Sequence, residues 1–141
     1  MKDKKGLQVS KLTYFNIAST AETDREHQVQ LALLGALCDS VSKKRSRDAV
    51  GEILEQLIAY SEAHFMSEEL LMRLQSYDGY EDHVDDHVAM MDMLRTIAVD
   101  HAAGQSALVV GKAAEVLNFI GIHIATRDKR FADHLRNGMQ N

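Results

Sequence analysis

The sequence contains no proline or tryptophan, and Cys38 is its one cysteine. A single cysteine excludes an internal disulfide, and no zinc-type Cys-x-x-Cys pair is present. One cysteine also suits a reducing compartment, and we therefore expect a cytoplasmic protein. Excess positive charge is lacking too, because 16 Lys and Arg stand against 21 Asp and Glu, and no basic stripe runs through the chain. DNA and RNA are therefore not expected as partners.

Long apolar runs are missing from the N-terminal segment MKDKKGLQVSKLTYFNIAST, which carries charges with no continuous hydrophobic stretch behind them. This segment predicts neither a signal peptide nor a membrane span. Internal repeats, low-complexity segments and linkers are also absent, and 141 residues suffice to bury one core without disulfides. We expect a single domain over residues 1–141, with an N-terminal arm over 1–18, a bundle over about 19–137 and no contact with a membrane.

The chain has few glycines and no segment of strand length with alternating polarity, so we expect helices throughout. Apolar residues recur at steps of three and four in four segments, whose expected starts are Ser19, Asp48, Asp78 and Ser106. The segments end at SKKRSR, SYDG, Gly104 and Gly138. Connections this short place each helix antiparallel beside the one before it. The expected fold is therefore all-α, an antiparallel up-down-up-down four-helix bundle.

Histidines interrupt the apolar stripes of these helices. Residues four apart on an α-helix lie about 40° apart around the axis and about 6 Å apart along it, so His83 and His87 project from one face as a chelating pair. The same spacing joins His64 to Glu68. The stripes of the first and fourth helices each carry one imidazole as well, His27 and His123. Every predicted helix therefore directs an imidazole into the core.

Buried imidazoles without partners would each cost roughly 1 to 3 kcal/mol, so a set of this size would cancel much of the stability of a domain. A water-filled cavity could supply partners, but imidazole nitrogens and carboxylate oxygens together suit first-row transition metal ions better. The donors exceed one tetrahedral zinc site and suffice for two ions held close together. Asp128 follows His123 by five residues, about 140° around an α-helix. We therefore expect Asp128 not to share the face of His123 and to reach sideways to a second ion, as a bridge.

Four motifs in the order DREHQ, HFMSEELLM, HVDDH and HIATRD resemble those of the bacterial hemerythrins. The resemblance runs from His27 to about Leu135 and implies two non-haem iron ions that bind O2 reversibly. It implies that one iron is held by His83, His87 and His123, and the other by His27 and His64. It also implies two bridging carboxylates beside an oxo or hydroxo group, Glu68 and Asp128. It implies as well that the iron with two histidines keeps an open position for O2, or for NO or small anions.

An apolar cover over the iron pair is implied by the same resemblance, formed by Phe65, Phe119, Ile120, Ile124 and Leu31. Such a cover would exclude water and stray protons, which would hinder the loss of peroxide and the formation of an inert diferric site. The segment LNFIGIH has Phe119 where the family commonly has a tryptophan, and Tyr77 is followed by Asp78 where proline is usual. We therefore expect a pocket of different shape around an intact ligand set.

Three further side chains receive no role in the predicted site. His101 lies near the end of the third helix, where a partly cationic imidazole favours the helix dipole. His134 lies about 16 Å along the helix axis from His123 and is too distant to share its metal ion. Cys38 is expected to be a buried, inert thiol and not a redox sensor.

Three functions are open to such a site. The first is a binding protein that carries, stores or senses O2 and is not an enzyme. The second is a di-iron redox enzyme, an oxidase, peroxidase or nitric oxide scavenger, on the same ligands. The third, iron storage of the ferritin type, fits poorly because ferritin-like sites are rich in Glu, whereas this set has five histidines and two carboxylates.

Binding is favoured over turnover because the pocket is predicted to hold no general acid or base beyond the ligands. The sequence does not separate a carrier from a sensor. A sensor would need a signalling partner or output domain that reads two states of the protein. The oligomeric state is equally open, since bundles of this kind occur as monomers and as oligomers.

Overall fold

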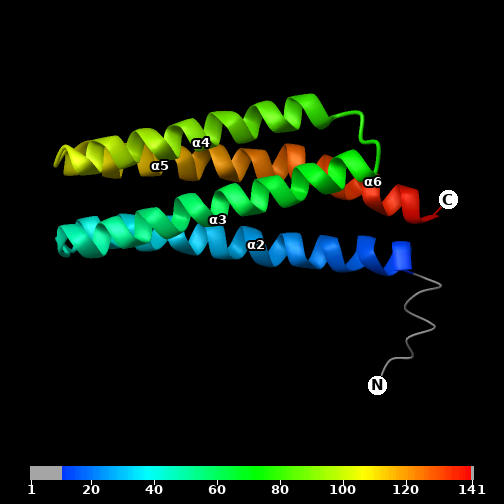
Figure 1. Ribbon diagram of the computed structural model, residues 1–141, viewed down its shortest axis with the longest axis horizontal. Coiled ribbons are helices and arrows are strands. Elements are labelled where there is room, and N and C mark those ends of the chain that lie inside the picture. Colours follow the sequence, from blue (N-terminus) through cyan, green and yellow to red (C-terminus); the bar gives the residue numbers. More distant parts are fainter. Residues whose placement is uncertain (1–10, 141) are drawn as a thin grey trace, which may run out of the picture.

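The computed structural model describes the backbone of residues 11–140 and the side chains of residues 24–138. The elements in chain order are α2 (Lys11–Ser42), α3 (Arg47–Leu74), α4 (Tyr80–Ala102), α5 (Ser106–His123), the π-helical turn η1 (Ile124–Asp128) and α6 (Lys129–Gln140). The last three follow one another without a break and form the fourth rod of the bundle (Figure 1). Successive rods run antiparallel, so the predicted all-α four-helix bundle is confirmed.

The first two helices begin earlier than the sequence suggested. α2 begins at Lys11 and not after Ser19, so residues 11–18 of the expected arm are helical. α3 is capped by Ser46, whose hydroxyl accepts a hydrogen bond of 3.1 Å from the amide of Ala49. The cap expected at Asp48 is therefore wrong. Its carboxylate lies in the first turn instead, where it favours the positive end of the helix dipole.

The turn between α3 and α4 depends on Gly79. A Cβ atom at this position would lie 2.7 Å from the ring of Tyr77, so no larger residue fits against that buried ring. α4 follows Gly79 without a side-chain cap, and the cap expected at Asp78 is wrong as well. Two acids in the first turn, Glu81 and Asp82, favour the helix dipole in its place.

The core lies where the inward stripes of the four rods meet. α2 packs on α3, α3 on α4, α4 on α5 and α5 on α2, which closes a ring of helices around one interior. The larger apolar cluster lies toward the α2–α3 and α4–α5 connections and includes Leu37, Leu57, Leu94, Ile97 and Val116. A smaller cluster at the other end holds Leu71, Met72, Tyr77, Phe131 and Leu135. The interior between these two clusters is polar, and it positions the site described below.

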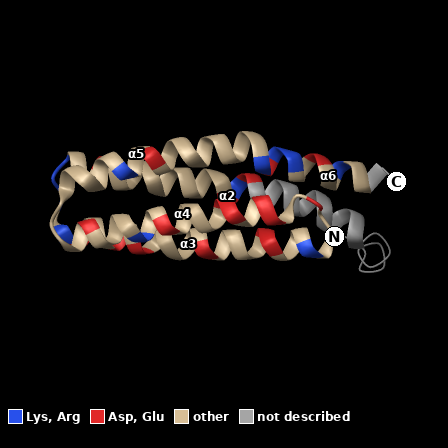
Figure 2. Ribbon diagram, turned by 90° about the horizontal axis from the view of Figure 1, so that it is seen from above, with Lys and Arg blue, Asp and Glu red and all other residues tan. Residues whose placement is uncertain are grey.

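Within the fourth rod α5 is strongly apolar, with Lys112 and Glu115 as its charged residues, whereas η1 and α6 carry many charges (Figure 2). By length and composition alone, the helix over Ser106–Gly138 could cross a membrane, with a mean hydropathy of 1.5 in its most apolar window. The inward face of α5 packs in the core through Val109, Ala113, Val116, Ile120 and His123. Of that window, 28% is buried. Packing in the bundle therefore accounts for part of its apolar character.

Leu57 on α3 has no exposed surface and lies in the larger cluster. We predict that Leu57→Ala lowers the free energy of unfolding of the metal-free protein by about 2 to 5 kcal/mol, because a cavity adds to the lost burial. Urea denaturation measures the change. Val99→Ala is the matched control, since Val99 is 67% exposed, and its effect should stay below about 0.5 kcal/mol. Equal losses in the two variants would contradict this packing.

Candidate metal centre

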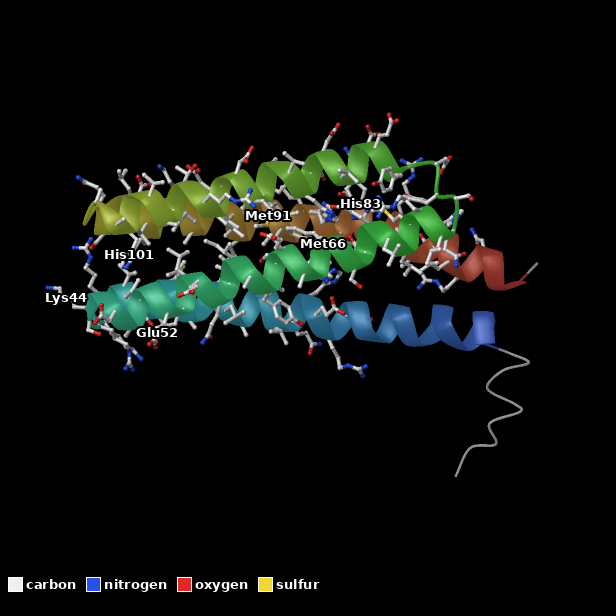
Figure 3. All side chains as sticks on the ribbon, in the orientation of Figure 1. Lys44, Glu52, Met66, His83, Met91 and His101 are labelled. Atoms are coloured by element: carbon white, nitrogen blue, oxygen red, sulfur yellow. The ribbon has the colours of Figure 1, made fainter. Side chains whose placement is uncertain are left out.

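The polar residues between the two apolar clusters come from all four rods. The seven predicted ligands are all buried: His27 on α2, His64 and Glu68 on α3, His83 and His87 on α4, His123 on α5 and Asp128 in η1. His83 shows the arrangement clearly, since it points from α4 into the interior of the bundle (Figure 3). The structure thus brings together side chains that lie as much as a hundred residues apart in the chain.

Five of these residues, Glu68, His83, His87, His123 and Asp128, have donor atoms that all lie within 4.8 Å of one another. His83 Nε2 is 2.6 Å from Glu68 Oε1 and 2.8 Å from Asp128 Oδ1. His87 Nε2 is 3.0 Å from the same oxygen of Glu68, and His123 Nε2 is 3.0 Å from the same oxygen of Asp128. Three imidazoles and two carboxylates therefore converge in one group, which we call the three-histidine group.

A second group consists of His27, His64 and Glu68, again with donor atoms within 4.8 Å of one another. Asp128 reaches this two-histidine group as well, because its Oδ2 lies 2.8 Å from His27 Nε2 while its Oδ1 faces the other group. Glu68 belongs to both groups. Each carboxylate therefore stands between the two groups, where it can bridge two cations.

The π-helical turn η1 brings Asp128 to the face of His123. In a regular α-helix, a residue five positions on would point about 140° away. A π turn closes its hydrogen bonds over one residue more than an α turn, so the fifth residue returns to the face of the first. The two side chains consequently approach to 3.0 Å. The expectation that they face apart is wrong, because it assumed an unbroken α-helix.

Most of these donor atoms have no hydrogen-bond partner among the described residues, although they are buried. They are Nε2 of His27, His83, His87 and His123, both carboxylate oxygens of Glu68, and Oδ1 of Asp128. Each unpaired buried group costs about 1 to 3 kcal/mol. Ligand atoms about 2.1 Å from one metal ion lie about 3 Å apart when they are at right angles, which agrees with the N···O separations here. The donor set therefore fits cations at both groups.

Three of the imidazoles also touch a carboxylate with their outer nitrogen. Nδ1 donates to Glu26 Oε1 at 2.5 Å in His64, to Glu69 Oε2 at 2.8 Å in His87 and to Asp86 Oδ2 at 3.0 Å in His123. Such a bond fixes the tautomer, so that Nε2 presents its lone pair to the cluster, and it raises the basicity of the ligand. The supporting carboxylates were not predicted from the sequence. A signal was present, because each is the chain neighbour of a predicted ligand.

The charges of the cluster favour bound cations. Burial by itself would lower the pKa of His83, but its contacts with Asp128 and Glu68 prevail and raise that pKa to about 9. Burial opposes ionisation of both carboxyls too, yet the surrounding histidines hold the pKa of Asp128 and of Glu68 below their usual values. The carboxylates are therefore ionised, and a proton on His83 occupies a position that a metal would take.

The surroundings of the cluster differ between its sides. Phe65 is buried and stacks on the ring of His87, with centroids 4.1 Å apart, and Ile120 is buried in the same apolar cluster. The other residues of the predicted cover, Leu31, Phe119 and Ile124, are partly buried against it. On another side, a cavity of about 230 Å³ touches three predicted ligands, His27, Glu68 and Asp128. Asp24, Lys129 and Arg136 also line this cavity, so its lining is partly charged.

The histidines that received no ligand role lie away from the cluster. His101 contacts the carbonyl of Arg47 at 3.1 Å, near the α4–α5 connection. His134 lies 3.3 Å from the carbonyl of Gln75 and packs on Tyr77, with ring centroids 5.0 Å apart. Cys38 is half-buried, so it is less enclosed than expected.

Residues 19–135 match the family described as the hemerythrin HHE cation binding domain. The match covers most of the chain, which therefore belongs to this family. No curated protein and no solved structure gives a significant match. The family and the buried cluster of histidines and carboxylates agree on one conclusion, that this chain is a metal-binding hemerythrin-like domain.

Removal of either shared carboxylate should weaken metal binding at both groups. We predict that Glu68→Ala or Asp128→Ala loses at least about tenfold in cation affinity, while far-ultraviolet circular dichroism retains most of the helix, because the apolar stripes carry the fold. Metal content after dialysis measures the loss. His101→Ala is the matched control and should retain its metal. Loss of metal from His101→Ala but not from His123→Ala would overturn the ligand assignment.

Metal binding should also compete with protons. The raised pKa of His83, about 9, means that a cation at its Nε2 must displace a proton at neutral pH. Apparent Zn²⁺ affinity, measured against a chromophoric chelator, should therefore rise about tenfold per pH unit up to about pH 9 and then level off. The free energy of unfolding of the metal-free protein should show the opposite trend and fall as the pH rises. The raised pKa of His83 stabilises the fold fully below about pH 6.5, and this stabilisation is lost as the pH rises through about 9. A flat affinity profile would contradict the assignment.

Proposed function

We propose that this domain binds O2 reversibly at two non-haem iron ions, as an oxygen carrier, store or sensor. The inequality of the two groups is the main support. One group has three histidines and two shared carboxylates, whereas the other has His27 and His64 with the same carboxylates and is one ligand poorer. The cavity touches the cluster at His27, which belongs to the two-histidine group, the group with fewer ligands. A small ligand such as O2, or NO and small anions in its place, would bind there.

Iron suits this donor set. Five imidazoles and two carboxylates are too many for one tetrahedral zinc ion and too rich in nitrogen for magnesium or calcium. Bound iron would supply the one-electron steps that reversible O2 binding needs. Glu68 and Asp128 would hold the two ions close together, beside an oxo or hydroxo bridge. The supporting carboxylates would keep Nε2 of three imidazoles directed at the ions.

The apolar residues would protect the bound ligand. Phe65 and Ile120 lie in the core cluster and exclude water from one side of the site. A dry, proton-poor wall hinders loss of the ligand in a reduced, protonated form. In this proposal Leu31, Phe119 and Ile124 extend the wall.

Binding is proposed over turnover because the described residues of the cavity include few free catalytic groups. Lys129 and Arg136 both pair with Asp133, which leaves Asp24 as the remaining ionisable group that is not a ligand. One observation favours the alternative, a di-iron oxidase, peroxidase or nitric oxide scavenger: the cavity lets small polar molecules approach His27. Both functions would use the same ligands, so only reversibility separates them.

We predict that the anaerobically reduced, iron-loaded protein develops a visible charge-transfer absorption band when O2 is admitted and loses it when O2 is removed. Iron should be counted on the same sample, with about two ions per chain expected for a bridged pair. His101→Ala should behave like the unsubstituted protein, and Asp128→Ala should show no reversible band. Repeated cycles without loss of amplitude would support a carrier, store or sensor.

A spectrum that passes at once to a static oxidised form would reject reversible binding. Steady consumption of O2, peroxide or NO by that same sample, with a reductant present, would then support the redox enzyme. Zinc in place of iron in protein purified without added metal would count against both functions.

A further inference from the structure

The three supporting carboxylates differ in what else they contact. Among the described side chains, Glu26 pairs with His64 and Glu69 pairs with His87. Asp86 pairs with His123, and its Oδ2 also accepts a hydrogen bond of 3.2 Å from Nε of Arg127. One oxygen therefore receives both the imidazole N–H and the guanidinium N–H.

Arg127 reaches this carboxylate because of the π turn. It directly precedes Asp128 in η1, so the turn that directs Asp128 into the cluster also directs Arg127 across to α4. Its Nη1 lies 3.9 Å from Asp82, one helical turn before Asp86. The arginine side chain is 37% exposed, whereas that of Asp86 is 24% exposed, so solvent screens this contact only in part.

The charge on Asp86 governs how strongly His123 donates to a metal. An imidazole whose N–H bonds to a carboxylate becomes more basic at its other nitrogen, and a more basic ligand favours the ion of higher charge. A guanidinium that bonds to the same oxygen withdraws charge from it, which weakens this effect.

We infer that Arg127 is a positioning residue that acts through Asp86 on His123 and raises the reduction potential of the ion in the three-histidine group. His87 belongs to the same group, and its partner Glu69 has no such cation among the described side chains. The π turn thus positions both the ligand Asp128 and Arg127, the residue that sets how strongly a second ligand, His123, donates to the metal. This inference rests on the proposed iron site, but it does not need O2.

Two substitutions should shift the potential in opposite directions. In Arg127→Gln the full charge of Asp86 acts on His123, so the preference for ferric over ferrous iron should rise about tenfold. For a one-electron couple, this change lowers the midpoint potential by about 59 mV. In Asp86→Asn the carboxylate is lost, so the midpoint should rise. Arg127→Lys keeps a cation beside Asp86, so its midpoint potential should lie between that of Arg127→Gln and that of the unsubstituted protein. Anaerobic redox titration of the iron-loaded variants measures these changes.

A purely structural role predicts a different result. If Arg127 only ties η1 to α4, both substitutions loosen the same contact and shift the midpoint in the same direction, which would overturn the inference. Arg95→Gln is the control for net charge, because Arg95 pairs with Glu62 at 3.5 Å on the exposed surface between α3 and α4. The midpoint potential of Arg95→Gln should match that of the unsubstituted protein. A shift in Arg95→Gln as large as that in Arg127→Gln would also overturn the inference.

Measurements of Co²⁺ binding test this inference independently of the proposed function. Co²⁺ affinity should rise in Arg127→Gln and fall in Asp86→Asn by up to about tenfold, with matching shifts in the visible ligand-field bands. If these changes occur but the iron protein fails to bind O2 reversibly, the proposed function fails and the inference stands. If O2 binds reversibly but neither potential nor Co²⁺ affinity responds, the inference fails alone.

Discussion

Seven polar side chains inside an apolar bundle impose the constraint on which the rest of this structure depends. Each buried group without a partner costs about 1 to 3 kcal/mol, against a total stability of about 5 to 15 kcal/mol for a domain. Glu68 and Asp128 meet part of this cost, because each lies within 3.0 Å of at least two imidazole nitrogens. Most of these same donor atoms still have no hydrogen-bond partner among the described residues, which points to cations. Fold and metal site are therefore coupled, since all four rods meet at the place where their polar residues need a shared partner.

The supporting carboxylates follow a regular pattern from rod to rod. In three places, the chain neighbour of a ligand supports a ligand on the next helix: Glu26 beside His27 supports His64, Glu69 beside Glu68 supports His87, and Asp86 beside His87 supports His123. Neighbours on an α-helix point about 100° apart. When one faces the interior, the next therefore faces the flanking rod. The same bonds that orient the imidazoles also tie adjacent rods together.

The fourth rod completes the site in another way. Its π turn is one residue longer than an α turn, which places His123 and Asp128 on one face and Arg127 beside α4. π turns of this kind occur frequently at functional sites, where they redirect side chains that a regular helix would turn away. Here the redirected carboxylate spans both groups with its two oxygens. The turn thus joins the two halves of the centre.

By itself, the sequence determined the helices, their antiparallel order and the inward direction of the histidines on them. Helical periodicity is local, so His83 with His87 and His64 with Glu68 can be recognised as inward pairs from spacing alone. Only the tertiary structure decided which carboxylate meets which imidazole, where the cavity opens and that Arg127 shares Asp86 with His123. Those contacts depend on how each rod is rotated against its neighbours, which the spacing within one helix does not specify. The π turn was not predicted for a related reason. The local sequence HIATRD is compatible with an α-helix, and only the convergence of Asp128 with ligands from the other rods shows that the turn is wider.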